Sequence, residues 1–217
     1  MSKKIDTIIF DLGGVLIDWN PRYLYRKIFS TEAEIDWFLE NICTHDWNEK
    51  QDAGRSFEEA TEELVQQFPE FEMPIRAWYG RWQETMNGSI QETVDIFKNM
   101  KNSNRYKIYA LTNWSKETFP WAMEKFEFLQ WFDGIVVSGV ENTRKPFPDF
   151  FQLLFDRHQI DPATAIFIDD NLRNIEGGQA LGLAGIHFHI NFRSLGNHFQ
   201  LLKFTSQLIR GVIMNSR

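Results

Sequence analysis

The segment Ile8-Ile9-Phe10-Asp11-Leu12-Gly13-Gly14 places one carboxylate and two glycines directly after an apolar run. Residues 5–10 are typical of a parallel strand that is buried on both faces. In open parallel α/β sheets, ligands bind beyond the carboxyl ends of the strands, and glycine there lets a ligand approach the backbone. The segment therefore predicts a buried first strand that delivers Asp11 as a candidate reactive carboxylate.

The second half of the chain repeats this pattern of apolar runs separated by helical segments. We expect further strands at 107–111, 134–138, 165–168 and 185–188. Helical patterns cover 90–100, 116–125, 147–155, 174–181 and a closing helix at 194–209. Strands that alternate with helices of this length favour an α/β fold with a doubly wound parallel sheet.

Residues 17–88 have a different character, because the helical pattern is continuous and no strand-like run occurs. Thr31 with Glu34, and Ser56 with Glu59, are spaced as capping boxes that begin helices. We therefore expect a core formed by residues 1–16 and 89–217, with an all-helical cap inserted at 17–88. Within this cap, the four-residue spacing of Trp78, Trp82 and Met86 favours a stripe packed in a core over a ligand site.

Composition excludes several classes of partner. The formal net charge of −7 argues against nucleic acid, and no stretch of 18 apolar residues predicts a membrane span. Cys43 is the only cysteine, which excludes an internal disulfide and a cysteine-based zinc site. With no signal-peptide pattern at the start, these features predict a cytoplasmic protein, and they leave its oligomeric state open.

Chemically useful side chains follow several of the predicted strands, at the edge where a parallel sheet gathers its carboxyl ends. They are Asp11, Thr112 with Asn113, Lys145, and Asp169 with Asp170. Three carboxylates on one edge repel each other, and Mg²⁺ relieves such repulsion while binding phosphate oxygens. A nucleophile, a metal site, a cation and neutral donors together indicate phosphoryl transfer.

Four segments in this order resemble the motifs of the haloacid dehalogenase superfamily, in its phosphatase-rich branch with a helical cap. They are Phe10-Asp11-Leu12-Gly13-Gly14-Val15, Leu111-Thr112-Asn113, Arg144-Lys145-Pro146 and Ile168-Asp169-Asp170-Asn171. The resemblance implies a Rossmann-like core in which Asp11 forms a covalent aspartyl intermediate. It further implies that Thr112 binds the phosphoryl group and that Lys145 steadies its charge. Asp11, the Gly13 carbonyl, Asp169 and Asp170 would bind Mg²⁺.

Gly13 departs from the family pattern, because related phosphatases usually carry there an aspartate that protonates the leaving oxygen. The Leu-Gly pair resembles that of sugar-phosphate phosphatases, in which another group would substitute, with Asp18, His45 and Asp46 as candidates, or water would act alone. A 2-haloacid dehalogenase, which uses the nucleophile without a metal, is a second reading. A catalytically weakened binding or regulatory protein is a third.

The polar and aromatic segment 44–55 of the cap is a candidate specificity loop. We expect Trp47 from this segment, Trp19 near the cap hinge, Thr112 and Asn113 to bind substrate. The sequence thus predicts a Mg²⁺-dependent phosphatase of a small phosphorylated metabolite, with sugar phosphates as one implied class.

Overall fold

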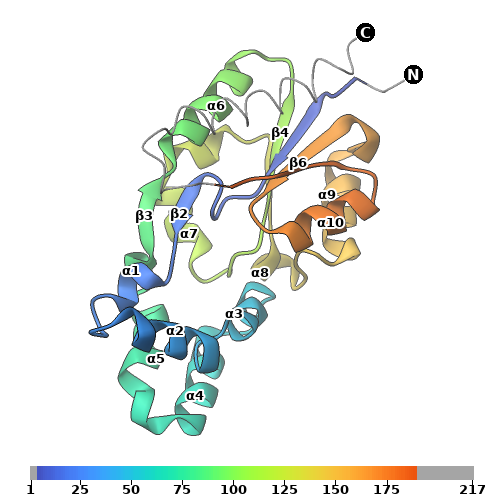
Figure 1. The fold of residues 1–217 in the computed structure, drawn as a ribbon. Helices are drawn as coiled ribbons and strands as arrows, with labels where there is room; N and C mark the ends of the chain where they lie inside the picture. Colours follow the sequence, from blue (N-terminus) through green and yellow to red (C-terminus); the bar gives the residue numbers. More distant parts are fainter. Residues whose placement is uncertain (1–3, 190–217) are drawn as a thin grey trace.

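The computed structural model describes residues 4–189 and has a five-stranded parallel sheet at its centre (Figure 1). The strand order is β5-β4-β1-β6-β7. The strands are β1 (Thr7–Phe10), β4 (Lys107–Thr112), β5 (Gly134–Val137), β6 (Ala165–Asp169) and β7 (Ala184–His187). All five predicted strands are present, and the predicted α/β class with a parallel sheet is confirmed.

Strand β1 is the central strand, and its register aligns the ends that carry the polar residues. Phe10 pairs with Ala110 of β4 and with Ile168 of β6. The backbone N–H of Asp11 donates to the carbonyl of Ile168 at 2.8 Å. Asp11 therefore emerges level with the ends of both neighbouring strands, as expected for the carboxyl edge of a parallel sheet.

Helices cover both faces of the sheet, so β1 is buried on both sides. Ile8 and Phe10 pack into one core with α6 and α7, whereas Ile9 packs into the other with α9 and α10. These helices and the short ones of this region are α6 (Gln91–Asn102), α7 (Phe119–Lys125), η3 (Glu127–Trp131), α8 (Ser138–Glu141), α9 (Pro148–His158), η4 (Pro162–Thr164) and α10 (Leu172–Ala180).

A helical cap lies beyond the carboxyl edge of the sheet (Figure 1). It contains α1 (Arg22–Tyr25), α2 (Glu32–Asn41), α3 (His45–Asp52), α4 (Phe57–Gln67), η1 (Pro69–Phe71), α5 (Glu72–Gly80) and η2 (Trp82–Thr85). The predicted capping box of Thr31 and Glu34 begins α2, and the Ser56 hydroxyl accepts from the N–H of Glu59 at the start of α4. Tyr25, Phe38 and Trp78 form part of a separate cap core.

Two short strands join the cap to the core and correct the expectation of a strandless insertion. Strand β2 (Ile17–Trp19) pairs antiparallel with β3 (Met86–Ser89). The sequence of β3, Met-Asn-Gly-Ser, has none of the β-branched or aromatic residues that favour strands, so its strand depends on pairing with β2. The predicted helix at 194–209 lies outside the described residues. Among residues 4–189, no helix is long and apolar enough to cross a membrane.

Candidate active site

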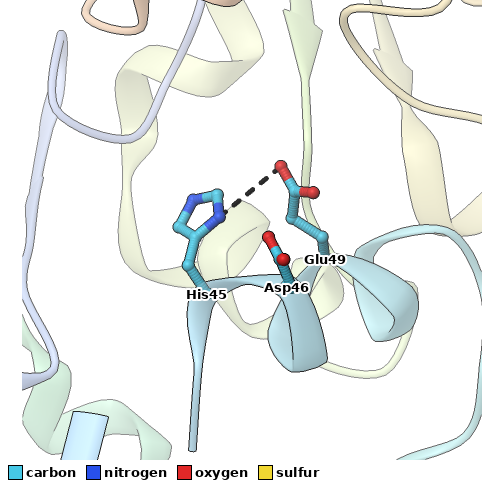
Figure 2. A group of neighbouring side chains, drawn as sticks. All are labelled: His45, Asp46 and Glu49. Atoms are coloured by element: carbon cyan, nitrogen blue, oxygen red, sulfur yellow. Dashed lines mark ion pairs between the residues drawn. The ribbon is translucent and has the colours of Figure 1, made fainter. Parts of the chain in front are cut away.

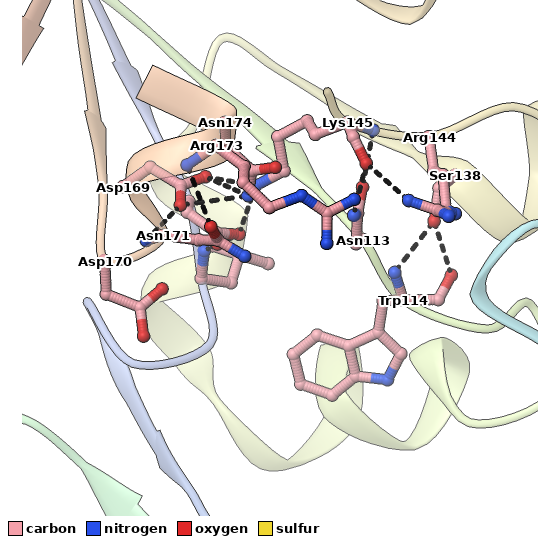
Figure 3. A network of polar contacts seen from close by, with 12 residues as sticks. Asn113, Trp114, Ser138, Arg144, Lys145, Asp169, Asp170, Asn171, Arg173 and Asn174 are labelled. Carbon is pink, nitrogen blue, oxygen red and sulfur yellow. Dashed lines mark hydrogen bonds and ion pairs between the residues drawn. The ribbon is translucent and has the colours of Figure 1, made fainter. Parts of the chain in front are cut away.

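A buried ion triad occupies the carboxyl edge of the sheet. The ammonium of Lys145 lies 2.9 Å from Oδ1 of Asp11 and 2.7 Å from Oδ2 of Asp169. Lys145 and Asp169 are fully buried, and Asp11 is 8% exposed. The amide of Asn174 donates to both oxygens of Asp169, at 3.0 and 3.1 Å, as Figure 3 shows. The triad is therefore held in place by direct hydrogen bonds as well as by charge.

The loop that carries Lys145 is fixed from two sides. Asn113 accepts from the backbone N–H of Lys145 at 2.9 Å and donates to its carbonyl at 3.0 Å. Arg144 donates to the same carbonyl at 3.0 Å (Figure 3). The amide of Asn113, which we expected to bind substrate, is thus engaged in positioning Lys145, although Asn113 also lines the pocket described below.

Burial and the neighbouring charges shift the pKa values of Asp11 and Lys145. Burial raises the pKa of Asp11 well above its usual value, and the charges of Asp169 and Asp170 raise it further against the opposing effect of Lys145. Burial lowers the pKa of Lys145, but the charges of Asp11 and Asp169 outweigh it, so the net shift is upward. Lys145 is consequently a permanent cation at neutral pH.

The residues present fit a divalent cation. Asp11, Asp169 and Asp170 each place a carboxylate oxygen within 4.8 Å of the others. With Lys145 as the cation of the triad, these three carboxylates carry two uncompensated negative charges when ionised. Oxygen ligands of this kind suit Mg²⁺. The carboxylate of Asp170 projects away from the hydrogen-bonded network (Figure 3), and burial beside Asp169 raises its pKa to about 6.

Gly14 explains why a second glycine follows Asp11. Its φ is +68°, in the left-handed region that favours glycine. A Cβ at this position would overlap the carboxylate of Asp170. Gly13 differs, because a Cβ there meets nothing within 4 Å. Glycine is therefore needed at position 14, because the carboxylate of Asp170 lies against it. At position 13 the space beside the backbone is open, so packing does not require glycine there.

Thr112 is the last residue of β4, and its hydroxyl is buried without a hydrogen-bond partner in the part of the chain that the structure describes. The side chain is 1% exposed, and Oγ1 has no hydrogen-bond partner among the described residues. A buried polar atom of this kind normally has a partner. A phosphoryl oxygen would supply one, and binding of the phosphoryl group by Thr112 stays a prediction.

A pocket between the cap and the sheet edge opens next to the triad. It contains about 480 Å³ of empty space, part of which is open to solvent. Gly13 and Asn113 line its core side. The aromatic side chains that line it are Trp19, Phe57, Tyr79, Trp82 and Trp114.

The structure separates the two tryptophans that we expected to bind substrate. Trp19 lines the pocket, which agrees with its predicted place. Trp47 is 7% exposed and packs in the cap core, where its ring centroid lies 5.6 Å from that of Trp78. Its indole N–H donates to the carbonyl of Ala60 at 3.3 Å. The prediction for Trp47 is therefore wrong, because the face that it occupies on α3 points into the cap core.

Helix α3 also connects the cap to the core. Glu49 pairs with Arg144 at 2.6 Å, and both side chains are mostly buried, 9% and 14% exposed. The backbone N–H of Phe57 donates to Glu117 of the core at 2.8 Å. A Cβ at Gly54, where φ is +105°, would overlap the side chain of Asn142. The cap is thus docked closely on the core in this structure.

The three candidates for the missing acid do not line the pocket. Asp18 accepts from Tyr23 at 2.9 Å and from Asn87 at 2.9 Å in the region of the β2–β3 ribbon. His45 and Asp46 are exposed on α3, where they form a cluster with Glu49 (Figure 2). Glu49 in this cluster already pairs with Arg144.

Several pocket residues were not predicted as site residues. Trp82 and Met86 pack in a hydrophobic core, as expected, but they also line the pocket, and so does Asp52 at the end of α3. Asp52 belongs to the segment 44–55 that was singled out as a candidate specificity loop. That segment was the available signal, but the sequence does not reveal which of its side chains face the sheet edge.

Comparisons with known proteins agree with this geometry. Residues 5–182 match the family of haloacid dehalogenase-like hydrolases. The sesquiterpene phosphatase astK of Aspergillus oryzae is 26% identical over 187 residues, which are 86% of this chain and 91% of that protein. The D-ribitol-5-phosphate phosphatase of Bacteroides thetaiotaomicron is 21% identical over 189 residues, which are 82% of this chain and 89% of that protein.

The fold is similar to that of solved members of the same family. The HAD family enzyme bt-2542 of Bacteroides thetaiotaomicron, crystallised with magnesium and inorganic phosphate, superposes with a TM-score of 0.66 at 20% identity. The match covers 87% of this chain and 98% of that one. With the family match over residues 5–182, the chain belongs to the haloacid dehalogenase-like hydrolases.

Proposed function

We propose that the protein is a Mg²⁺-dependent phosphomonoester hydrolase that acts through a phosphoaspartate at Asp11. The observation that carries this proposal is the buried triad of Asp11, Lys145 and Asp169, with Asp170 close to it and a pocket alongside. A dehalogenase needs no metal, and a third carboxylate near the nucleophile would only raise the repulsion there. Metal-assisted phosphoryl transfer makes use of that carboxylate.

Each residue has a distinct task in this proposal. A carboxylate oxygen of Asp11 attacks phosphorus, while the Lys145 ammonium and the Thr112 hydroxyl hold the oxygens of the transferring group. Asp169, whose two oxygens already accept hydrogen bonds, orients Lys145. Magnesium held by Asp11, Asp170 and the Gly13 carbonyl would neutralise charge on the phosphoryl oxygens.

The lining of the pocket supports an ester whose organic part has a substantial apolar surface. Five aromatic side chains and Met86 line the space and make up most of its side-chain surface, together with five smaller polar residues, Asn48, Asp52, Asn113, Ser115 and Thr118. Burying apolar surface contributes about 25 cal/mol per Å², so a hydrocarbon group gains more from these walls than a polyol. The relative astK is named as a sesquiterpene phosphatase, which agrees with this preference. A sugar phosphate remains the second class to test.

A substrate panel tests the proposal. Hexyl phosphate, ribitol 5-phosphate, p-nitrophenyl phosphate and 2-chloropropionate are assayed with Mg²⁺ and with a chelator. We expect phosphate release that the chelator abolishes, and a higher kcat/KM for hexyl phosphate than for ribitol 5-phosphate. Chloride release that is insensitive to the chelator would favour the dehalogenase. Turnover of none of the four compounds would reject the hydrolase that we propose.

A further inference from the structure

Gly13 leaves open the question of which group protonates the leaving oxygen. Gly13 and Asp52 both line the pocket, and Asp52 is the last residue of cap helix α3. Among the pocket-lining residues that the structure describes, Asp52 is the only carboxylic acid. The cap thus brings a carboxyl group to the same pocket that Gly13 lines from the core.

We propose that Asp52 is the general acid and base of this enzyme, delivered by the cap in place of the usual aspartate at position 13. This inference rests on the phosphatase function proposed above. It assigns the cap a catalytic task in addition to covering the site.

The contacts of α3 support a fixed position for Asp52. Glu49 lies three residues earlier on the same helix and is anchored to Arg144 of the core at 2.6 Å. Residues three apart lie on the same helix face, so the face that is tied to the core also presents Asp52. Gly54, two residues later, is in close contact with Asn142. Asp52 is therefore held between two points of contact with the core.

The other titratable group that lines the pocket is less suited to the task. The hydroxyl of Tyr79 accepts from Gln51 at 2.8 Å and donates to Asn48 at 3.1 Å. Burial raises the pKa of Tyr79 far above its usual value, so its proton stays bound at neutral pH. It would serve neither as a base nor as a reversible acid.

The surroundings of Asp52 suit a group that must both give and take a proton. Its Oδ2 accepts from Asn48 at 3.1 Å. Burial and the charge of Glu49 raise the pKa of Asp52 to about 7, against the opposing effects of Arg144 and Lys145. An acid–base group is most effective when its pKa lies near the working pH.

In the proposed reaction, Asp52 gives up one proton and regains one, so it is unchanged after a full cycle. In the first step, an oxygen of Asp11 bonds to phosphorus, the bond from phosphorus to the leaving oxygen breaks, and the Asp52 carboxyl gives its proton to that oxygen. In the second step, the Asp52 carboxylate takes a proton from water as the water oxygen bonds to phosphorus and the bond to Asp11 breaks. The products are the alcohol and phosphate, and Asp52 is protonated again.

The test compares Asp52→Asn with wild type on two leaving groups. Hexyl phosphate needs an acid, whereas p-nitrophenolate leaves without one. We expect kcat/KM for hexyl phosphate to fall by ~10²–10⁴-fold. With p-nitrophenyl phosphate, the variant should release a burst of nitrophenolate and then accumulate phosphorylated Asp11, detected by intact mass. Glu40→Gln, an exposed acid on the cap helix α2, is the control and should behave as wild type.

A rescue experiment separates catalysis from structure. The double variant Gly13→Asp with Asp52→Asn restores an acid at the usual family position, where a Cβ meets nothing within 4 Å. We expect it to recover at least tenfold in kcat/KM for hexyl phosphate over Asp52→Asn alone. Equal losses on both substrates, with neither burst nor rescue, would overturn the assignment and leave the phosphatase intact. A wild type that hydrolyses no phosphomonoester would reject the proposed function, and the assignment with it.

Discussion

The ammonium of Lys145 lies 2.9 Å from Oδ1 of Asp11, and the backbone N–H of Leu12 donates to the same oxygen at 2.7 Å. Both interactions favour the ionised form of Asp11, which is the form that attacks phosphorus. The charge and hydrogen bond of Lys145 oppose the effect of burial on the pKa of Asp11. The oxygen that these donors hold is fixed in direction. Its partner on the same carboxyl, Oδ2, is left for the phosphoryl group or the metal.

Asp11→Asn should abolish turnover without unfolding the protein. The amide keeps the shape of the side chain but removes the nucleophilic charge. We expect kcat to fall by several orders of magnitude while the far-UV circular dichroism spectrum is unchanged. Phosphate release at more than a tenth of the wild-type rate would exclude a covalent intermediate at Asp11.

Lys145→Met should destabilise the fold, because it leaves Asp11 and Asp169 buried without their cation. Removing one partner of a buried ion pair destabilises a protein by about 3–5 kcal/mol. Because Lys145 lowers the pKa of Asp11, losing the cation raises that pKa, and protonation of Asp11 relieves the repulsion as the pH falls. We therefore expect the loss in unfolding free energy, measured by denaturant titration, to be smaller at pH 5 than at pH 8. A loss that is equal at both pH values would contradict this account.

The part of the site that the sheet carries could be predicted from sequence, because the topology of the strands determines where its residues lie. Asp11, Thr112 and Asp169 each follow an apolar run, and parallel strands bring such ends to one edge whatever their separation along the chain. Lys145 is in a loop and was located by its motif. The clamp by which Asn113 holds Lys145 was not predicted, since an amide after a strand is also a common turn residue.

The cap residues that line the pocket could not be predicted, because they depend on which faces of the cap helices meet the core. Trp47 and Asp52 lie five residues apart on α3, and the sequence gives both a plausible place in a pocket. Trp47 packs in the cap core, whereas Asp52 lines the pocket. Only the docking of α3 through Glu49 and Arg144 distinguishes them, and that contact joins residues far apart in the chain.

Gly14→Ala should weaken Mg²⁺ binding, whereas Gly13→Ala should not. At position 14 the new methyl group would overlap the carboxylate of Asp170, in a left-handed conformation that is unfavourable by about 1–2 kcal/mol for other residues. At position 13 the methyl group meets nothing within 4 Å. We expect at least a tenfold higher Kd for Mg²⁺ in Gly14→Ala by isothermal titration calorimetry. Equal affinities of the two variants would argue against Asp170 as a ligand.

Activity toward alkyl phosphates should decline above about pH 7. Burial and Glu49 raise the pKa of Asp52 to about 7, and the general acid must be protonated when the leaving oxygen departs. The protonated fraction falls as the pH rises through this value, and kcat/KM for hexyl phosphate falls with it. The profile for Asp52→Asn should lack this descending limb. A limb that persists in the variant would assign the titration to another group.

Glu49→Gln should weaken the hold of the cap on the core. Glu49 and Arg144 form a largely buried pair at 2.6 Å, and truncating one partner of such a pair across an interface costs about 2–5 kcal/mol. The more exposed Arg173 lies 3.8 Å from Glu49, so solvent screens its contribution.

Because Arg144 also donates to the carbonyl of Lys145, loosening the cap would disturb the triad as well. We expect kcat/KM to fall at least tenfold in Glu49→Gln, and no change in Glu58→Gln, an exposed acid on the cap helix α4. A double-mutant cycle with Arg144→Gln should give a coupling energy of at least about 1 kcal/mol. Additive effects would mean that the two side chains act independently and that cap docking depends on the contacts of Phe57 and Gly54 alone.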